Sequence, residues 1–528
     1  MQDIAPETDG GQPAAVPPPT ARVSPLQAAL LASVFIVAAC GLAYELIAGA
    51  LASYLLGDSV TQFSTIIGAY LFAMGVGSWA SKYVRSDIVG RFVAIEIAVG
   101  LIGGFSAAAL FLAFAADLGP FRVLLYGLVF VVGFFVGLEI PLVMRILKNE
   151  VEFRELVARV LSFDYLGALA VSVMFPLVLA PHLGLVRTGL LFGFANIAVA
   201  IWALFLFRDR LQGRAGLKLG AWGGMALLAG GFAGAGHFTT LAEGWIYADE
   251  VIHAETSKYQ RIVVTRFRDD IRLYLNQNLQ FSSRDEYRYH EALVHPGLAA
   301  MPRARRVLVL GGGDGLAVRE VLKHAQVDQV TLVDLDPAMT ELFSRAPLLA
   351  RLNGQAFDSP RVRHLNADAA RWLEDTAEVF DFVIVDFPDP SNHAIGKLYS
   401  TGFYRLLDKR LAPGGRVVVQ ATSPYYARQS FWTVVTTLEA AGFQTAPYHA
   451  LVPSFGEWGF ILAARQGDAP YAPPSSVAVP TRFVTAETLP DLFRFPADMA
   501  RVPAEPNRMN EQTLVRVFER EWRQVTHH

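Results

Sequence analysis

The sequence has little charge and a single cysteine. Asp, Glu, Lys and Arg together make up 18% of the 528 residues, below the about 25% that is usual in soluble domains. Hydrophobic residues reach 53% and the mean hydropathy is +0.34, which indicates a membrane protein. The one cysteine, Cys40, lies in an apolar run, which excludes an internal disulfide and a cysteine-based zinc or iron–sulfur site.

An excess of positive charge is also missing. The net charge is −3 and the isoelectric point is near 6.4, and no long run of Lys and Arg supplies a local basic patch, so we expect no nucleic-acid partner. Residues 1–24 are rich in Pro, Gly and Ala, and they lack the basic start of a signal peptide. We expect a disordered tail over 1–24.

Long apolar runs fill the N-terminal half of the chain. They alternate with short polar loops up to about His237, and each can cross a hydrocarbon core of roughly 30 Å. We expect seven membrane-spanning helices, at residues 26–48, 63–84, 92–115, 122–146, 165–182, 187–207 and 219–236. Pro176 and Pro181 interrupt the fifth, so a re-entrant or interfacial segment is the alternative there. The prediction is a multi-pass α-helical domain over 25–240 in the cell (inner) membrane, with the lipid bilayer as its partner.

Positive charge collects in alternate loops of this region. The loops after the second, fourth and sixth expected helices, with their flanks, carry Lys82, Arg85, Arg91, Arg145, Lys148, Arg154, Arg159, Arg208, Arg210, Arg214 and Lys218. The positive-inside rule puts these loops and the N-terminus in the cytoplasm. Seven spans would then place everything after His237 outside the cytoplasm, which conflicts with the use of a cytosolic nucleoside. The side of the soluble part stays open.

Three glutamates fall inside or near the ends of expected spans: Glu45, Glu96 and Glu139. An ionisable group in a membrane needs a partner or a water-filled cavity. These residues are therefore candidates for a cation path or a polyamine site. The alternative is that Glu45 and Glu139 reach the interface or pair with groups such as Arg145.

After about residue 245 the pattern changes to short β-rich runs and then to strands alternating with helices. This alternation predicts a parallel α/β sheet. We expect a small N-terminal β-sheet over 245–300 and a Rossmann-like domain of the class I methyltransferase type over 301–466. A linker and a helical extension should occupy 467–528.

A strand, a glycine turn and a helix follow one another in VLVLGGGDGLAVREVLKH, residues 307–324. Glycines such as Gly311 and Gly313 let a backbone approach a nucleoside, and the helix start offers N–H groups. The next strand ends near Asp334, where a carboxylate can bind both ribose hydroxyls; the alternative is that Asp334 and Asp336 cap the following helix. Asp368 ends another strand, where it suits an adenine amino group but would equally serve as an N-cap.

The run FDFVIVDFPDP leads a buried strand into a loop that carries Asp386 and Asp389. Paired carboxylates beside a nucleoside pocket suit a cationic amine, because they hold the ammonium and one can remove its proton. The alternative is two solvated loop acids. Upstream, LYLNQNLQFSSRDEYRYHEALVHP predicts two short strands and an acidic, aromatic helix start that includes Tyr289 and His290.

The order of these motifs resembles the polyamine aminopropyltransferases, the spermidine synthase family, from about Tyr259 to Ala464. The matching pieces are YQRIVV, LNQNLQFSSRDEYRYHE, GGGDGLAVREVLKH, VDLDP, NADAARWL, VDFPDP, LYSTGFYRLLDKRLAPGG and VPSFGEWGF. The N-terminal part resembles the membrane-fused branch, whose first helices carry a Tyr-Glu pair like Tyr44 and Glu45.

The resemblance implies transfer of an aminopropyl group from decarboxylated S-adenosylmethionine, as co-substrate, to an amine such as putrescine, giving spermidine and methylthioadenosine without a metal. It implies that Asp386 is the general base. The residues it places at the polyamine are His290, Asp314 and Asp389, beside which we add Tyr289. Those it places at the nucleoside are Gln260, Asp334, Asp368 and Ala369, next to Gly311 and Gly313. Family members are commonly dimers or tetramers, so the resemblance also implies a homo-oligomer.

The sequence departs from the family pattern at three places. These are Asn276–Gln277 in place of Asp-Gly, Phe387–Pro388 in place of hydroxyl residues, and Ser391–Asn392–His393 where Gly-Pro is common. We expect an altered pocket and an acceptor that need not be putrescine. Two other functions stay open: methyl transfer from S-adenosylmethionine, and a polyamine sensor or transporter whose synthase-like domain only binds.

Overall fold

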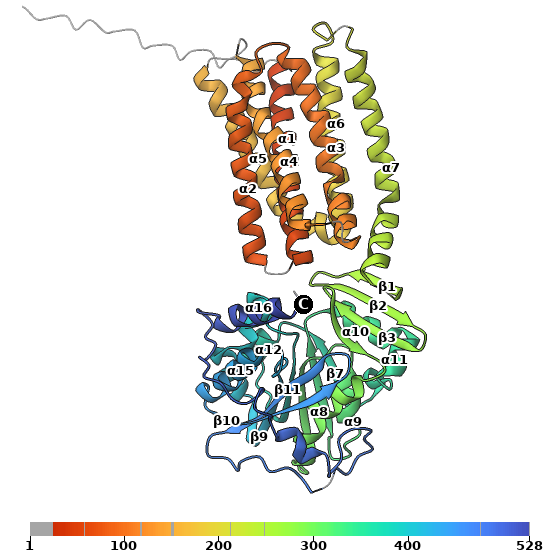
Figure 1. Cartoon of the computed structure of the whole chain (residues 1–528), viewed down its shortest axis with the longest axis vertical. Helices are drawn as coiled ribbons and strands as arrows, with labels where there is room; N and C mark the ends of the chain where they lie inside the picture. The colour runs from red at the N-terminus through yellow and green to blue at the C-terminus, as the bar shows by residue number, and fades with distance from the viewer. Residues whose placement is uncertain are drawn as a thin grey trace, which may run out of the picture.

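The computed structural model describes residues 25–56, 59–116, 119–148, 153–211, 213–247, 249–475 and 477–526. The tail expected over 1–24 lies outside them. The chain forms a helical bundle and an α/β domain, stacked along the long axis of the molecule (Figure 1). Helix α7 leads from the bundle directly into the first strand of the α/β domain.

Seven helices form the described part of the bundle: α1 (Pro25–Leu56), α2 (Ser59–Ala80), α3 (Ile88–Ala115), α4 (Phe121–Leu147), α5 (Phe153–Met174), α6 (Ala180–Leu206) and α7 (Ala215–Ile246). Glycines bring their backbones together. A Cβ added to Gly137 would lie 2.1 Å from the carbonyl oxygen of Met74, and one added to Gly77 would lie 2.0 Å from that of Phe134. Helices α2 and α4 therefore pack backbone to backbone, as small residues permit in lipid.

Within the described residues, five stretches are long and apolar enough to cross a membrane: Gln27–Leu56, Val60–Tyr83, Ile88–Ala115, Phe121–Leu147 and Glu155–Leu206. The last contains the fifth and sixth expected spans together, and the seventh is not among them. Pro176 lies in a π-helical turn, Phe175–Leu179, because proline has no N–H for the α-helical hydrogen bond. Gly184 then breaks the helix with φ 73° and ψ 170°.

Two contacts place the basic loops at one end of the bundle. Arg214, before α7, pairs with Asp87, before α3, at 2.6 Å. Arg145, near the end of α4, donates a hydrogen bond to the carbonyl oxygen of Ser81 at 3.2 Å. Helix α7 starts at this end and runs for 32 residues to the other, where the α/β domain begins (Figure 1). The basic loops and the α/β domain thus lie at opposite ends.

The α/β domain contains two sheets. Strands β1 (Glu250–Thr256), β2 (Arg261–Phe267), β3 (Asp270–Leu275) and β4 (Asn278–Ser282) form an antiparallel meander. The second sheet has seven strands: β5 (Arg306–Gly311), β6 (Gln329–Asp334), β7 (Val362–Asn366), β8 (Phe380–Asp386), β9 (Leu411–Gln420), β10 (Phe443–Val452) and β11 (Gly456–Arg465). Its order is β10-β11-β9-β8-β5-β6-β7; β11 is antiparallel to both of its neighbours, β10 and β9, and the other neighbouring pairs are parallel.

This order is the expected Rossmann-like sheet. The chain reverses direction across the sheet between β5 and β8, the place where open α/β sheets bind ligands. Side chains 307–310 of β5 and 382–385 of β8 are fully buried, because helices cover both faces of a parallel sheet. The helices are α8 (Glu286–Ala299), α9 (Leu316–Leu322), α10 (Pro337–Arg345), α11 (Pro347–Leu352), α12 (Ala369–Asp375), α13 (His393–Gly396), α14 (Thr401–Asp408), α15 (Arg428–Ala440) and α16 (Thr513–Thr526).

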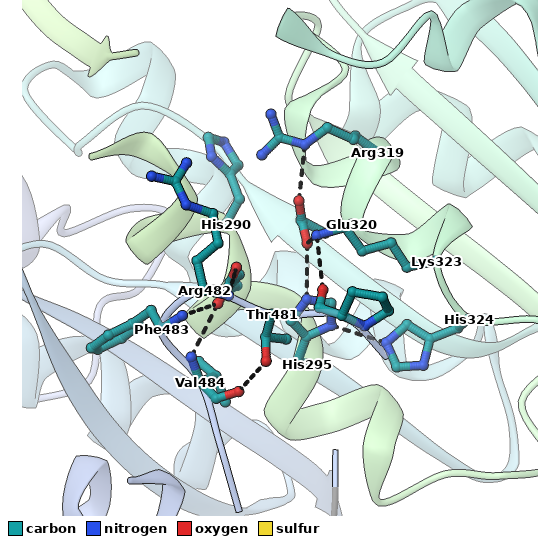
Figure 2. Close-up of polar contacts among 12 residues, drawn as sticks. His290, His295, Arg319, Glu320, Lys323, His324, Thr481, Arg482, Phe483 and Val484 are labelled. Atoms are coloured by element: carbon teal, nitrogen blue, oxygen red, sulfur yellow. Dashed lines mark hydrogen bonds and ion pairs between the residues drawn. The ribbon is translucent and has the colours of Figure 1, made fainter. Parts of the chain in front are cut away.

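Residues 480–484, which we name the C-terminal strap, bind back onto α8. The buried carboxylate of Glu291 accepts hydrogen bonds from the backbone N–H groups of Arg482, Phe483 and Val484 at 2.7, 2.7 and 3.0 Å. Figure 2 shows this contact beside the charged residues of α9. The strap therefore fixes the outer side of the helix that carries Tyr289 and His290.

The hairpin turn between β3 and β4 offers a test of local strain. Asn276 and Gln277 have φ of 49° and 70°, and the amide nitrogen of Gln277 is buried with no partner among the described residues. We expect Gln277→Gly to raise the free energy of unfolding of the α/β domain by about 1 kcal/mol, because glycine adopts positive φ without strain. Thermal unfolding measures this. Asn278→Gly, in the strand, is the control and should lower stability; no rise for Gln277→Gly contradicts the prediction.

Candidate active site

The glycine turn after β5 packs directly against two acidic strand ends. Gly311 has φ 82°, and a Cβ there would lie 2.2 Å from the carbonyl oxygen of Asp386. A Cβ on Gly313 would lie 2.7 Å from the carboxyl carbon of Asp334, whose Oδ2 accepts the Gly313 N–H at 3.0 Å. The fold thus brings the turn, the end of β6 and the end of β8 together, as the sequence predicted.

Asp334 and Asp336 make different contacts, and only Asp336 caps the following helix. Asp336 caps α10 by accepting the Ala338 N–H at 3.1 Å, so the capping alternative is right for Asp336. Asp334 instead accepts the N–H groups of Gly313 and Asp336, and burial raises its pKa to about 6. Gln260 donates from Nε2 to Asp336 Oδ2 at 2.9 Å, which holds Gln260 beside the same turn.

Asp368 is the N-cap of α12. Its Oδ1 accepts the N–H groups of Ala370 and Arg371 at 2.9 and 3.2 Å, and its Oδ2 lies 3.0 Å from Lys397 Nζ. Burial opposes ionisation, but the Lys397 pairing and the backbone N–H groups together lower the pKa of Asp368. Ala369 is buried behind it. The capping alternative is therefore correct, and binding of adenine by this pair stays a prediction.

The loop after β8 carries two desolvated acids. Asp386 Oδ1 accepts a hydrogen bond from the Tyr289 hydroxyl at 2.6 Å. Asp389 Oδ2 accepts one from Thr422 at 3.2 Å, while its Oδ1 is buried without a partner in the described chain. Burial raises the pKa of Asp386 to about 6 and that of Asp389 to about 7. The alternative of two solvated loop acids is wrong.

His290 and Asp314 complete the acidic site. Nδ1 of His290 lies 2.8 Å from Glu286 Oε2. Burial lowers the pKa of His290, but the hydrogen bond and charge of Glu286 outweigh it and the net shift is upward. Burial raises the pKa of Asp314, which the positive charge of His290 partly offsets. The roles of Glu286 and Thr422 are not evident from the sequence motifs; the four-residue spacing from Glu286 to His290 is the available signal.

The departure at Phe387 affects the core. Its ring packs against Phe403 at 5.7 Å and Tyr399 at 6.5 Å between centroids. The Tyr399 hydroxyl donates to the carbonyl oxygens of Phe387 and Pro388, each at 3.2 Å. Asn392 caps α13 by accepting the Ile395 N–H at 3.0 Å. The Phe387 ring therefore fills the interior behind the acids, and we attribute no change of the pocket to it.

A second polar cluster lies inside the helical bundle. Asn196 of α6 donates to Glu96 Oε2 of α3 at 2.7 Å and accepts from the Tyr44 hydroxyl of α1 at 3.1 Å. Glu139 of α4 is 1% exposed, and neither of its carboxylate oxygens has a partner among the described residues. The expected alternative of a pair with Arg145 is wrong for Glu139, because Arg145 binds the α2–α3 connection.

Comparison with known proteins matches both parts of the chain. The family model for the spermine/spermidine synthase domain matches residues 286–472. "Polyamine aminopropyltransferase 2" of Ralstonia nicotianae is 61% identical over 506 residues, 94% of this chain and 99% of the relative. The "polyamine aminopropyltransferase" of Leptospira interrogans is 50% identical over 500 residues, 95% and 100% of the two chains. A spermidine synthase crystallised with the transition-state analogue AdoDATO is 25% identical with TM-score 0.44, over 47% of this chain and 86% of that one.

The contact between Gly313 and Asp334 predicts the effect of one added methyl group. In Gly313→Ala the Cβ would meet the Asp334 carboxylate, so this carboxylate must move away from its predicted contact with the ribose. We expect binding of methylthioadenosine to weaken by about tenfold or more, on the order of one lost hydrogen bond to a charged group. Calorimetric titration measures this. Gly402→Ala, where the nearest atom is 3.4 Å away, is the matched control; equal affinity in both variants contradicts the assignment.

Proposed function

The chain belongs to the polyamine aminopropyltransferase family, the spermidine synthases, and from this premise we propose how its residues carry out the reaction. The enzyme transfers the aminopropyl group of decarboxylated S-adenosylmethionine to putrescine or a related amine, giving spermidine and methylthioadenosine. The observation that carries the residue assignment is the half-buried pair Asp386 and Asp389, whose pKa values are raised by desolvation, beside the glycine turn. This pair favours aminopropyl transfer over methyl transfer, since methyl transfer needs no second acid for a diamine.

The nucleoside lies along the ends of β5, β6 and β7. Asp334 binds the ribose hydroxyls, with Gln260 beside them, and Gly311 and Gly313 leave room for the backbone to approach. Asp368 and Ala369 contact adenine at the start of α12. This arrangement directs the sulfonium toward Asp386 at the end of β8.

The amine binds among the acids as a cation. Asp389 and Asp314 hold it, His290 lies beside them, and Tyr289 orients the Asp386 carboxylate. Asp386 takes one proton from the ammonium group, and the freed lone pair attacks the aminopropyl carbon in line with the carbon–sulfur bond. A carbon–nitrogen bond forms as the carbon–sulfur bond breaks, and the sulfur leaves as a neutral thioether. The protein supplies position and a proton acceptor.

Replacement of Asp386 tests the proposed base. We expect Asp386→Asn to lower kcat/KM by about 10²–10⁴-fold, the usual contribution of a general base, when methylthioadenosine release is measured by mass spectrometry. Asp381→Asn, at the opposite end of the same strand, is the control and should keep activity because its carboxylate only accepts the Arg305 and Arg306 N–H groups. An active Asp386→Asn enzyme contradicts the assignment.

The pH dependence of the same enzyme follows from the raised pKa values. A base with a pKa of about 6 is protonated below that pH, so kcat/KM of the wild type should fall as the pH drops through about 6 to 7, where Asp389 also titrates. Steady-state measurement of kcat/KM from about pH 5 to about pH 9 covers this window. The fall on the acidic side, the acidic limb of the profile, is the quantity to compare. A flat profile down to the lower end contradicts a buried carboxylate base.

We further propose that the helical bundle spans the cell membrane and that the α/β domain lies on its non-cytoplasmic side, which requires its nucleoside co-substrate to reach that side. Support comes from the apolar stretches of the bundle and from the basic loops gathered at the end opposite the α/β domain. The positive-inside rule assigns the basic end to the cytoplasm. At the end near the α/β domain the described connections carry few cations, chiefly Arg122 and Arg187.

The single native cysteine makes this orientation easy to test. Cys40 is fully buried, so a Cys40→Ala background accepts one reporter cysteine at a time. We expect a membrane-impermeant maleimide to label Arg345→Cys in intact spheroplasts, and to label Arg208→Cys only after lysis. Both side chains are exposed, 78% and 80%. The reverse pattern places the α/β domain in the cytoplasm, and labelling of both sites before lysis contradicts membrane insertion.

A further inference from the structure

A buried ion-pair network joins α8 to α9 next to the amine site. Arg319 donates to Glu286 at two points, Nη1 to Oε1 and Nη2 to Oε2, both 2.9 Å. Its Nε donates to Glu320 Oε1 at 2.9 Å. The Glu286 side chain is 7% exposed and that of Arg319 is 19% exposed. The planar guanidinium therefore fixes the Glu286 carboxylate in one orientation.

The outer part of the network keeps Arg319 in place. Glu320 Oε2 lies 2.9 Å from His295 Nε2 and 2.6 Å from Lys323 Nζ, and His295 Nδ1 lies 3.0 Å from His324 Nε2. Figure 2 shows these side chains next to the strap, where Lys323 Nζ donates a hydrogen bond to the carbonyl oxygen of Pro480 at 3.2 Å. Glu320 is 1% exposed, and Arg319, His295 and Lys323 together compensate its buried charge, which is costly to leave unpaired.

Glu286 in turn fixes the ring of His290. Nδ1 of His290 lies 2.8 Å from the Glu286 carboxylate and 2.8 Å from the Glu286 carbonyl oxygen. Two acceptors at Nδ1 require the proton there, so Nε2 is the nitrogen left for the amine site. The charged and titratable groups around His290 are Glu286 and Tyr289 on α8, Arg319 on α9, Asp314 after β5 and Asp386 after β8.

We propose that Glu286 is a positioning residue of the amine site, which orients His290 and stabilises its imidazolium form beside Asp386, so that Asp386 stays ionised before the amine binds. An imidazolium near a carboxylate favours the carboxylate over the acid. Arg319 acts as the rigid support that holds the Glu286 carboxylate in its contact with His290. The inference rests on the proposed role of Asp386 as the base.

The test is the pH profile of Glu286→Gln in the full-length detergent-solubilised enzyme, with putrescine and decarboxylated S-adenosylmethionine as substrates. Loss of the carboxylate charge removes support for the imidazolium, and Asp386 then ionises only at higher pH. We expect the acidic limb of kcat/KM to move upward by about half a pH unit or more, with most of the rate recovered on the alkaline side. An unmoved limb, with the rate lowered equally at every pH, overturns the proposal.

Two controls separate positioning from general damage. Glu291→Gln removes another buried carboxylate of α8, one that binds the strap, and should lower the unfolding temperature without moving the limb. In a His290→Asn background the shift caused by Glu286→Gln should vanish, because Glu286 acts through His290. A shift in Glu291→Gln equal to that in Glu286→Gln, or one that persists without His290, overturns the proposal.

A second variant covers the case in which Glu286→Gln does not fold. Arg319→Lys keeps both charges but loses the two-point contact, and it should move the same limb upward by a smaller amount; a folded Arg319→Lys enzyme with an unmoved limb overturns the proposal. Failure of the function assignment looks different. If Asp386→Asn keeps its activity, the base itself is wrong, whereas an inactive Asp386→Asn beside an unmoved limb removes only the role of Glu286.

Discussion

The desolvation of negative charge at one edge of the parallel sheet governs this structure. Asp314, Asp334, Asp386 and Asp389 all lie near the ends of β5, β6 and β8, and burial raises the pKa of each. Such a group of acids is costly to assemble, and a bound cation relieves the cost. The site is therefore suited to bind positive charge, such as the sulfonium and ammonium groups of the proposed substrates.

The elements around the acids serve mainly to hold them in place. The glycine turn fits against Asp334 and Asp386 because no side chain stands between them. Helix α8 supplies Tyr289 and His290. Arg319 and the C-terminal strap hold this helix in place through Glu286 and Glu291. Rigid support of this kind suits a reaction whose leaving group is already good, because the remaining barrier is one of alignment and proton removal.

Local patterns in the sequence predicted most of the sheet and the acids at its edge. Apolar runs that end in Gly311, Asp334 and Asp386 are strong signals of buried parallel strands. The glycine or acid that ends each run marks the edge of the sheet. Strand β10 has no clear strand pattern because it contains Pro447, which an edge strand tolerates. Contacts between distant residues, such as Glu286 with Arg319 and Glu291 with the strap, cannot be predicted from local sequence patterns. The interruption expected at Pro176 is present as a π-helical turn, whereas the break at Gly184 was not predicted.

The short link between α7 and β1 has a consequence for how the enzyme moves. Only residues 247–249 separate Ile246 from Glu250, so the α/β domain stays next to the end of α7. If the bundle lies in a bilayer, the site stays near the lipid surface, and the enzyme meets its substrates while it diffuses in the plane of the membrane. Substrates would then arrive, and products leave, along the membrane surface, where charges act on one another over a screening distance of about 8 Å.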